Sequence, residues 1–224
     1  MKRETCIALA VLAVLPFTTA QASDFVNPKL KEKEVTIRSV IMLPPIVDVT
    51  KHGVKGAQGM GKEADQDTTE MSSGVERALA DRGISVQAPF TQEALESNEE
   101  LRTAMADVQK RFDEIADQLY KKHKDVRKGR FTLGDSVAIL NTKGTADALV
   151  IVRATGNQET KSKAFMTGGL MGMAMAGEPT FQARVALVDA KNGDILFLGD
   201  YVSKGLPKDK TYEKSFHNIP VSGK

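Results

Sequence analysis

The chain has 224 residues, of which 41% are hydrophobic and 27% are charged. This balance is that of a globular protein, so it excludes a wholly disordered chain and a collagen-like fibre. The net charge of +2 is too small to indicate nucleic-acid binding through bulk electrostatics. Aromatic residues make up only 5% and tryptophan is absent, which weakens any expectation of sugar or base stacking.

The first 22 residues have the pattern of a secretory signal peptide. Residues 1–3 are a short basic start, and residues 7–17 are an apolar run. Ala20 and Ala22 then form the small-residue pattern at which such leaders are cleaved. As a helix the apolar run reaches about 16 Å, whereas a bilayer core needs about 30 Å. We therefore expect cleavage after Ala22 and a periplasmic location, with secretion beyond the cell as the alternative.

The only cysteine, Cys6, precedes the apolar run, so it is not placed as the acylated cysteine of a lipoprotein. Cleavage leaves a chain without cysteine, which excludes thiol catalysis, disulfides and cysteine-based zinc sites. Nucleotide cofactors are not expected outside the cytoplasm. We expect no cofactor and no metal site.

The mature chain opens with a polar lead-in, 23–34. The first strong strand candidate is 35–43, which starts with alternating apolar residues and becomes continuously apolar, as in a strand buried on both faces. Pro44 and Pro45 end it, because proline cannot donate a hydrogen bond to a neighbouring strand. A loop rich in glycine follows over 51–66.

A helix is predicted to start at Asp67, because Asp67 and Glu70 have the spacing of a capping box. An apolar residue then recurs every four positions, at Met71, Val75 and Leu79. Gly83 is placed to end this helix, and a short strand is expected over 84–88.

The segment 98–124 predicts the longest helix. Its apolar residues are alternately four and three apart, as in a heptad seam: Leu101, Met105, Val108, Phe112, Ile115 and Leu119. Asn98 is placed to cap the helix. The seam has two interpretations, packing on the protein's own sheet or a dimerising coiled coil.

Asp135 begins a short third helix, and 148–152 is another buried strand. The runs 181–188 and 195–202 flank an Asn-Gly turn, a strong hairpin signal, and 204–224 is expected to be a flexible tail. The order is strand, helix, strand, helix, helix, strand, hairpin. It predicts an α/β fold with a mixed parallel and antiparallel sheet and helices packed on it, in a single domain over 35–203.

Motifs for catalysis are weak. The run 56–63 nearly matches a phosphate-binding loop, but Glu63 replaces the hydroxyl residue and would repel phosphate. Three histidines are present, far apart in sequence: His52, His123 and His217. Carboxylates of the long helix lie off its apolar seam, which favours a solvated face over a glycosidase pair. The acids considered are Asp107, Asp113, Glu114, Asp117, Asp135 and Asp147.

The most unusual segment is 164–177, AFMTGGLMGMAMAG, which has no charged residue. It is interpreted as mobile, and four roles are open. It could be a buried loop or packing helix, or a surface for a partner or for self-association, because methionine adapts to varied partners. It could instead contact a membrane, or bind Cu(I) through thioethers. The partner or membrane contact would be made by Phe165, Met166, Leu170, Met171, Met173 and Met175.

Four short motifs are spread along the chain between about residues 35 and 202: 39–45, 80–86, 144–152 and 186–196. In these motifs it resembles the periplasmic α/β domains of bacterial envelope proteins. That group includes the lipoprotein activators of penicillin-binding proteins, the curli-secretion lipoprotein and the amino-terminal domain of the Tol–Pal propeller protein. The resemblance implies a fold, an envelope location and an accessory role, without catalytic residues. The lipid-bearing cysteine is absent, and Phe197 lies near the place of a tryptophan that often ends the last strand in the group.

We therefore expect a non-catalytic accessory protein, not an enzyme, that acts by protein–protein contacts in the bacterial cell envelope. Its partner would be an envelope protein or a second copy, with no nucleic acid and with peripheral membrane contact as an option. The alternative is a subunit of an oligomeric outer-membrane assembly or secretion channel, with 164–177 facing lipid. The third possibility is a hydrolase that uses aspartate and glutamate.

Overall fold

The computed structural model describes most of the chain after the expected leader. The described residues are 21–54, 56–59, 61–87, 90, 92–121, 128, 130–175, 179–207, 209–217 and 219–220. The predicted signal peptide, apart from Gln21 and Ala22, lies outside them. Among the described residues, none of the helices has both the length and the apolar character that crossing a membrane requires.

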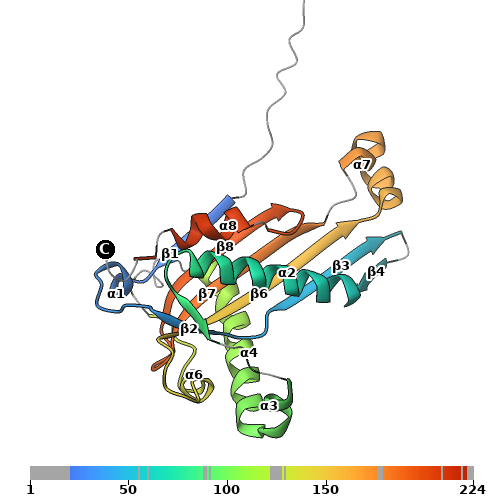
Figure 1. Cartoon of the computed structure of the whole chain (residues 1–224). Helices are drawn as coiled ribbons and strands as arrows, with labels where there is room; N and C mark the ends of the chain where they lie inside the picture. The colour runs from blue at the N-terminus through green and yellow to red at the C-terminus, as the bar shows by residue number, and fades with distance from the viewer. Residues whose placement is uncertain are drawn as a thin grey trace, which may run out of the picture.

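The described strands form one mixed sheet, which confirms the expected α/β class (Figure 1). The strands are β1 (Gln21–Val26), β2 (Ser39–Met42), β3 (Ile46–Gly53), β4 (Gly56–Gly59), β5 (Ser85–Gln87), β6 (Ala148–Glu159), β7 (Thr180–Asp189) and β8 (Ile195–Lys204). The helices are α1 (Pro28–Lys31), α2 (Gly61–Ala80), α3 (Gln92–Ser97), α4 (Glu99–Lys121), α6 (Ser136–Leu140), α7 (Lys161–Met175) and α8 (Asp209–Phe216).

Strand β6 is the centre of the sheet. Its first five residues are all buried, and it pairs antiparallel with β7 along one side. On its other side it pairs in parallel first with β2 and then with β3. Pro44 and Pro45 separate β2 from β3, as expected of residues that cannot donate to a ladder. After the prolines the chain continues as β3, which pairs with β6. The sequence pattern did not predict this strand.

Helices α2 and α8 cover one face of the sheet (Figure 1). The predicted stripe of Met71, Val75 and Leu79 is fully buried there. Gly83, with φ +72°, follows the helix as predicted. The helix begins at Gly61 and not at Asp67. The prediction of a loop over 51–66 was therefore wrong, because this stretch contains β4 and the first turns of α2.

Helix α4 covers part of the opposite face. Leu101, Met105, Val108 and Phe112 from the predicted seam are buried in this second core. The side chain of Leu119 lies outside the described residues. The seam therefore packs on the protein's own sheet. Asn98 caps the helix, since its Oδ1 accepts from the Leu101 N–H at 3.1 Å.

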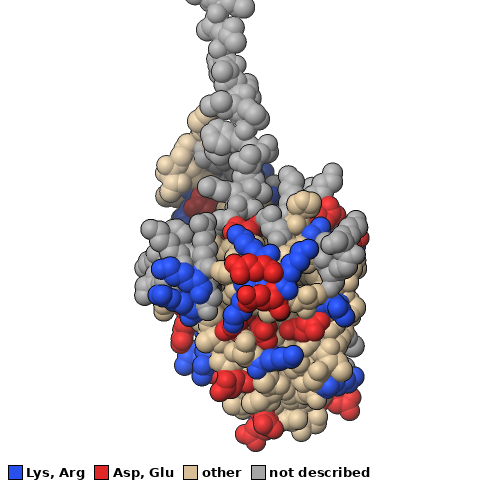
Figure 2. Space-filling view, turned by 90° about the vertical axis from the view of Figure 1, so that its left-hand side faces the viewer, with Lys and Arg blue, Asp and Glu red and all other residues tan. Residues whose placement is uncertain are grey.

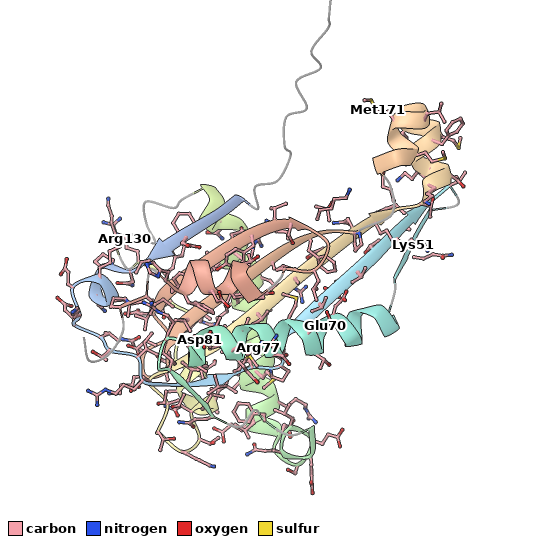
Figure 3. All side chains as sticks on the ribbon, turned by 45° about the horizontal axis from the view of Figure 1, so that its top comes forward. Lys51, Glu70, Arg77, Asp81, Arg130 and Met171 are labelled. Carbon is pink, nitrogen blue, oxygen red and sulfur yellow. The ribbon has the colours of Figure 1, made fainter. Side chains whose placement is uncertain are left out.

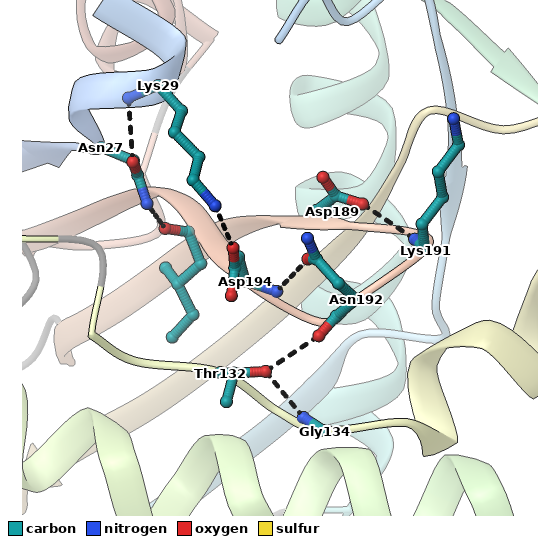
Figure 4. Close-up of polar contacts among 9 residues, drawn as sticks. Asn27, Lys29, Thr132, Gly134, Asp189, Lys191, Asn192 and Asp194 are labelled. Carbon is teal, nitrogen blue, oxygen red and sulfur yellow. Dashed lines mark hydrogen bonds and ion pairs between the residues drawn. The ribbon is translucent and has the colours of Figure 1, made fainter. Parts of the chain in front are cut away.

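The N-terminal segment corrects the expected polar lead-in over 23–34. Strand β1 pairs antiparallel with β8, and α1 buries Leu30 completely. Backbone pairing with an open sheet edge explains the strand, because it needs little apolar sequence. Asn27 fixes the junction: its Nδ2 donates to the Ile195 carbonyl at 2.9 Å, and its Oδ1 accepts from the Lys29 N–H (Figure 4).

The expected flexible tail is also corrected for residues 209–217. Helix α8 buries Tyr212 and Phe216. The ring of Tyr212 meets Tyr201 edge-on at 6.0 Å, and the ring of Phe216 lies 5.6 Å from Phe197. Aromatic burial on this scale outweighs the polar composition of the segment.

The predicted Asn-Gly turn joins β7 to β8 (Figure 4). Gly193 has φ +74°, a conformation that glycine adopts without a steric penalty. The Thr132 hydroxyl donates to the Asn192 carbonyl and accepts from the Gly134 N–H. Lys29 of α1 binds Asp194 at 2.8 Å, and this hydrogen bond raises the pKa of the Lys29 amine. The turn is thereby tied to two other segments.

Candidate functional site

Helix α7 is the candidate contact segment, and it stands at one end of the sheet (Figure 1). The Thr160 N–H before the helix donates to the carbonyl of His52 at the end of β3, at 3.0 Å. The Thr160 hydroxyl accepts from the Lys163 N–H at 3.3 Å, which caps the first turn. Ala164 is buried. These contacts hold the base of α7 to the sheet.

A kink divides α7 at Gly169, which has φ 61° and ψ −150°. Only glycine adopts such a conformation without strain. Neither Gly168 nor Gly169 has a heavy atom within 4 Å of the position a Cβ would take. The segment is thus two short helical pieces with open space around their junction.

The predicted contact residues of α7 are exposed wherever their side chains are described. Phe165 is 50% exposed, Met166 72%, Leu170 73%, Met171 80% and Met173 39%. The side chain of Met175 lies outside the described residues. The described side chains are thus not part of the core, which corrects the buried-loop interpretation for them. Met171 and Met173 lie two positions apart in a helix, about 200° around its axis, which is a poor arrangement for thioethers around one Cu(I).

The predicted glycine-rich loop is a β-hairpin. Strand β3 pairs antiparallel with β4 from Thr50 opposite Gly59 to Gly53 opposite Gly56. A phosphate-binding loop would instead connect a strand directly to a helix. The segment 56–59 is a strand, so the hairpin supplies a second structured element at the same end of the molecule as α7.

The outer half of one sheet face is open to solvent. Side chains alternate between faces along a strand, and Ile151, Ala186 and Leu198 point toward α4. Farther along the same strands, this alternation places two rows of residues on this face, each row paired across β3, β6, β7 and β8. We call these eight residues the open face: Asp48, Thr155, Gln182 and Val202 in one row, and Thr50, Asn157, Thr180 and Lys204 in the next. All eight are exposed or half-buried.

Two arginines mark the border between the open face and the core. Arg153 binds Asp48 at 3.1 Å and Asp113 of α4 at 3.4 Å. Arg184 lies 3.4 Å from Asp200, which is only 2% exposed. Each of these pairs gives the carboxylate a guanidinium partner within the protein. Sequence reasoning missed both arginines, although Arg153 begins the polar alternation of β6 and Arg184 ends that of β7.

Three of the remaining candidate acids, Asp107, Glu114 and Asp147, have structural contacts. Asp135 precedes α6, but its side chain makes no capping hydrogen bond. Asp147 accepts from the backbone N–H groups of Arg38 and Ser39. Asp107 accepts from Ser136, which with the Arg111 guanidinium lowers the pKa of Asp107 below its ordinary value. Glu114 lies 4.0 Å from Lys110. The side chain of Asp117 lies outside the described residues.

The two histidines that the structure describes, His52 and His217, belong to different segments of the fold. His52 lies beside Asn157, with Nε2 3.2 Å from Oδ1, and His217 follows α8. His123 lies outside the described residues. Within the described part of the chain, no three side chains of His, Cys, Asp or Glu are grouped as metal ligands.

By sequence, the chain matches no family model and no curated protein. It is similar to solved structures of bacterial proteins. A PelC dodecamer from Paraburkholderia phytofirmans is 11% identical, with a TM-score of 0.39, covering 88% of this chain and 91% of that one. A dodecamer of a PelC point variant from the same organism is 10% identical, with a TM-score of 0.37, over 88% and 92%. The LpoB C-terminal domain from Salmonella enterica is 12% identical, with a TM-score of 0.26, over 78% and 93%.

The identities and TM-scores of these structures are too low to carry over a location, an assembly or an activity to this chain. What the structure itself shows is an α/β protein with one mixed sheet.

Proposed function

We propose that this chain is a non-catalytic accessory protein of the bacterial cell envelope, periplasmic or secreted, that acts by protein–protein contacts. The observation that carries the proposal is the open face. Paired strands there present two rows of side chains, all polar except Val202, that the described helices leave exposed or half-buried.

A sheet face suits a contact surface because its side chains are held in place before the partner arrives. Strands β6, β7 and β8 are fixed by their backbone ladders, and Arg153 and Arg184 brace the border. Binding then costs little ordering entropy on the side of this chain. Threonine, asparagine and glutamine offer donors and acceptors of the kind found at ordinary protein interfaces. Helix α7 is a second proposed contact surface, for a partner or for a membrane.

The proposal is tested by photo-crosslinking in the protein's own cells. A photoreactive amino acid is placed at Thr155 on the open face, with Lys191, exposed in the β7–β8 turn, as the matched control. We expect a discrete adduct with an envelope protein from position 155 and none from 191. The variant Thr180→Arg, on the same face, should reduce the adduct by blocking the contact. No adduct at 155, or the same adducts at both positions, would overturn the proposal.

A further inference from the structure

Most of the exposed large apolar side chains in the described chain lie at one end. Eight such side chains are exposed among the described residues, and six of them are on α7 or at the β3–β4 turn, at the same end of the sheet. We call these six the apolar tip: Val54, Phe165, Met166, Leu170, Met171 and Met173. Five are on α7, and Val54, 60% exposed, is at the turn between β3 and β4. Scattered single apolar residues are normal on a surface, but six at one end are not.

The two elements of the tip are held together by the sheet. Strand β3 pairs with β6 as far as His52 opposite Glu159. The Thr160 N–H then binds the His52 carbonyl, so α7 starts where β3 turns into β4. Figure 1 shows both elements at the same end of the sheet, and Figure 3 shows Met171 and Lys51 there.

The charges around the tip are mainly positive. Lys161 and Lys163 lie in the first turn of α7, and Lys51 lies on β3 beside its base. Glu159 is 3.8 Å from Lys163, and no charged residue occurs in 164–177. Figure 2 shows the opposite end, where acidic and basic side chains are interspersed. The tip therefore combines apolar side chains with lysines at their base, a pattern typical of peripheral membrane contact.

The shape of the tip favours lipid over a protein. Its six side chains lie on two separate elements that project from the end of the sheet. A lipid layer conforms to such a projection, whereas a protein partner would need a matching hollow.

We propose that the apolar tip inserts into the surface of an anionic lipid membrane, with Lys51, Lys161 and Lys163 at the level of the headgroups. The inference rests on the envelope location in the proposed function. It assigns α7 to the membrane and leaves the open face for protein contact.

The test is co-sedimentation of the exported, purified protein with vesicles. One set contains phosphatidylglycerol mixed with phosphatidylcholine, and the other contains phosphatidylcholine alone. We expect binding to the anionic set. The double variant Leu170→Glu, Met171→Glu should weaken it about tenfold or more, because carboxylates would enter the apolar layer. Lys161→Gln should weaken it about fivefold.

Ile139→Glu is the matched control, because Ile139 is the exposed apolar residue of α6, away from the tip. It should bind as the parent does, and thermal melts should show every variant folded. No binding to anionic vesicles, equal binding to both sets, or binding unchanged in the double variant would overturn the inference. So would a dimer in lipid-free solution that the double variant converts to a monomer, because the tip would then pair with a second copy.

The two proposals can fail separately. The vesicle assay contains no partner protein, and it reports only on the apolar tip. The crosslink at position 155 reports only on the open face. Loss of one result with the other retained identifies which surface was wrongly assigned.

Discussion

The ring of Phe181 lies directly over Gly156. The two residues are opposite each other on β7 and β6, and a Cβ added to Gly156 would stand 2.8 Å from the ring atom Cε1. Phe181 is 1% exposed, so its ring has little room to move away. The absence of a side chain at position 156 is thus what lets this part of the core close.

We therefore expect Gly156→Ala to destabilise the fold by about 1–3 kcal/mol, the range for an overpacked core. Chemical denaturation measures the free energy of unfolding. Gly59→Ala is the control, because no heavy atom lies within 4 Å of its added Cβ. An unchanged midpoint for Gly156→Ala would mean that the ring is not held against the glycine.

Asn27→Ala should also destabilise the protein, by about 2 kcal/mol. It removes the cap of α1 and leaves the buried Ile195 carbonyl without its side-chain donor. Asn27→Asp separates the two effects, since it keeps the capping oxygen and loses the donor. Equal stability of the alanine variant and the parent would show that β1 and α1 are not anchored at this residue.

The ion pair and hydrogen bond at Asp107 predict a dependence on pH. The lowered pKa means that their stabilising contribution is present at neutral pH and is lost as the pH falls through the pKa of the folded carboxyl. Ser136→Ala should raise the pKa of Asp107 toward its ordinary value, as measured by NMR titration. Ser136→Thr, which keeps a hydroxyl, should raise it less. A pKa that is the same in all three proteins would contradict the assigned cause.

Replacing residues 166–175 with a short Gly-Ser linker should leave the fold intact. The described large side chains of this stretch are exposed, so their loss should change the free energy of unfolding by about 0.5 kcal/mol or less. Ala164, which is buried, stays in place. Circular dichroism melts provide the measurement. A protein that no longer folds would place the segment in the core and would remove its role as a contact surface.

The sequence predicted the elements whose signals are local. The buried strand 148–152, the α4 seam and the Asn-Gly turn are where they were expected, because burial and turn geometry act directly on those residues. The strand expected over 35–43 is shorter and covers only β2, Ser39–Met42. Strand β1 could not be predicted, since it forms through backbone pairing with the edge of β8 and has no apolar pattern of its own.

Two features were missed although a signal was present. Tyr212 and Phe216 are four residues apart, the spacing of one helix face, and both are buried in α8. In β6 the apolar run gives way to alternation from Arg153 onward, which marks the change from two covered faces to one. The exposed residues of α7 were singled out by the composition of their segment. The position of Val54 near them could not be predicted, because it depends on the β3–β4 hairpin.

The pairing of β1 with β8 has a consequence for the predicted export of the chain. Gln21 lies opposite Val202 and Ala22 opposite Tyr201. If the leader is cut after Ala22, the scissile bond lies within a strand that is hydrogen-bonded to the sheet. A protease needs that stretch extended and unpaired. Maturation would then have to precede the docking of the N-terminal strand, and a chain that folded first would retain its leader.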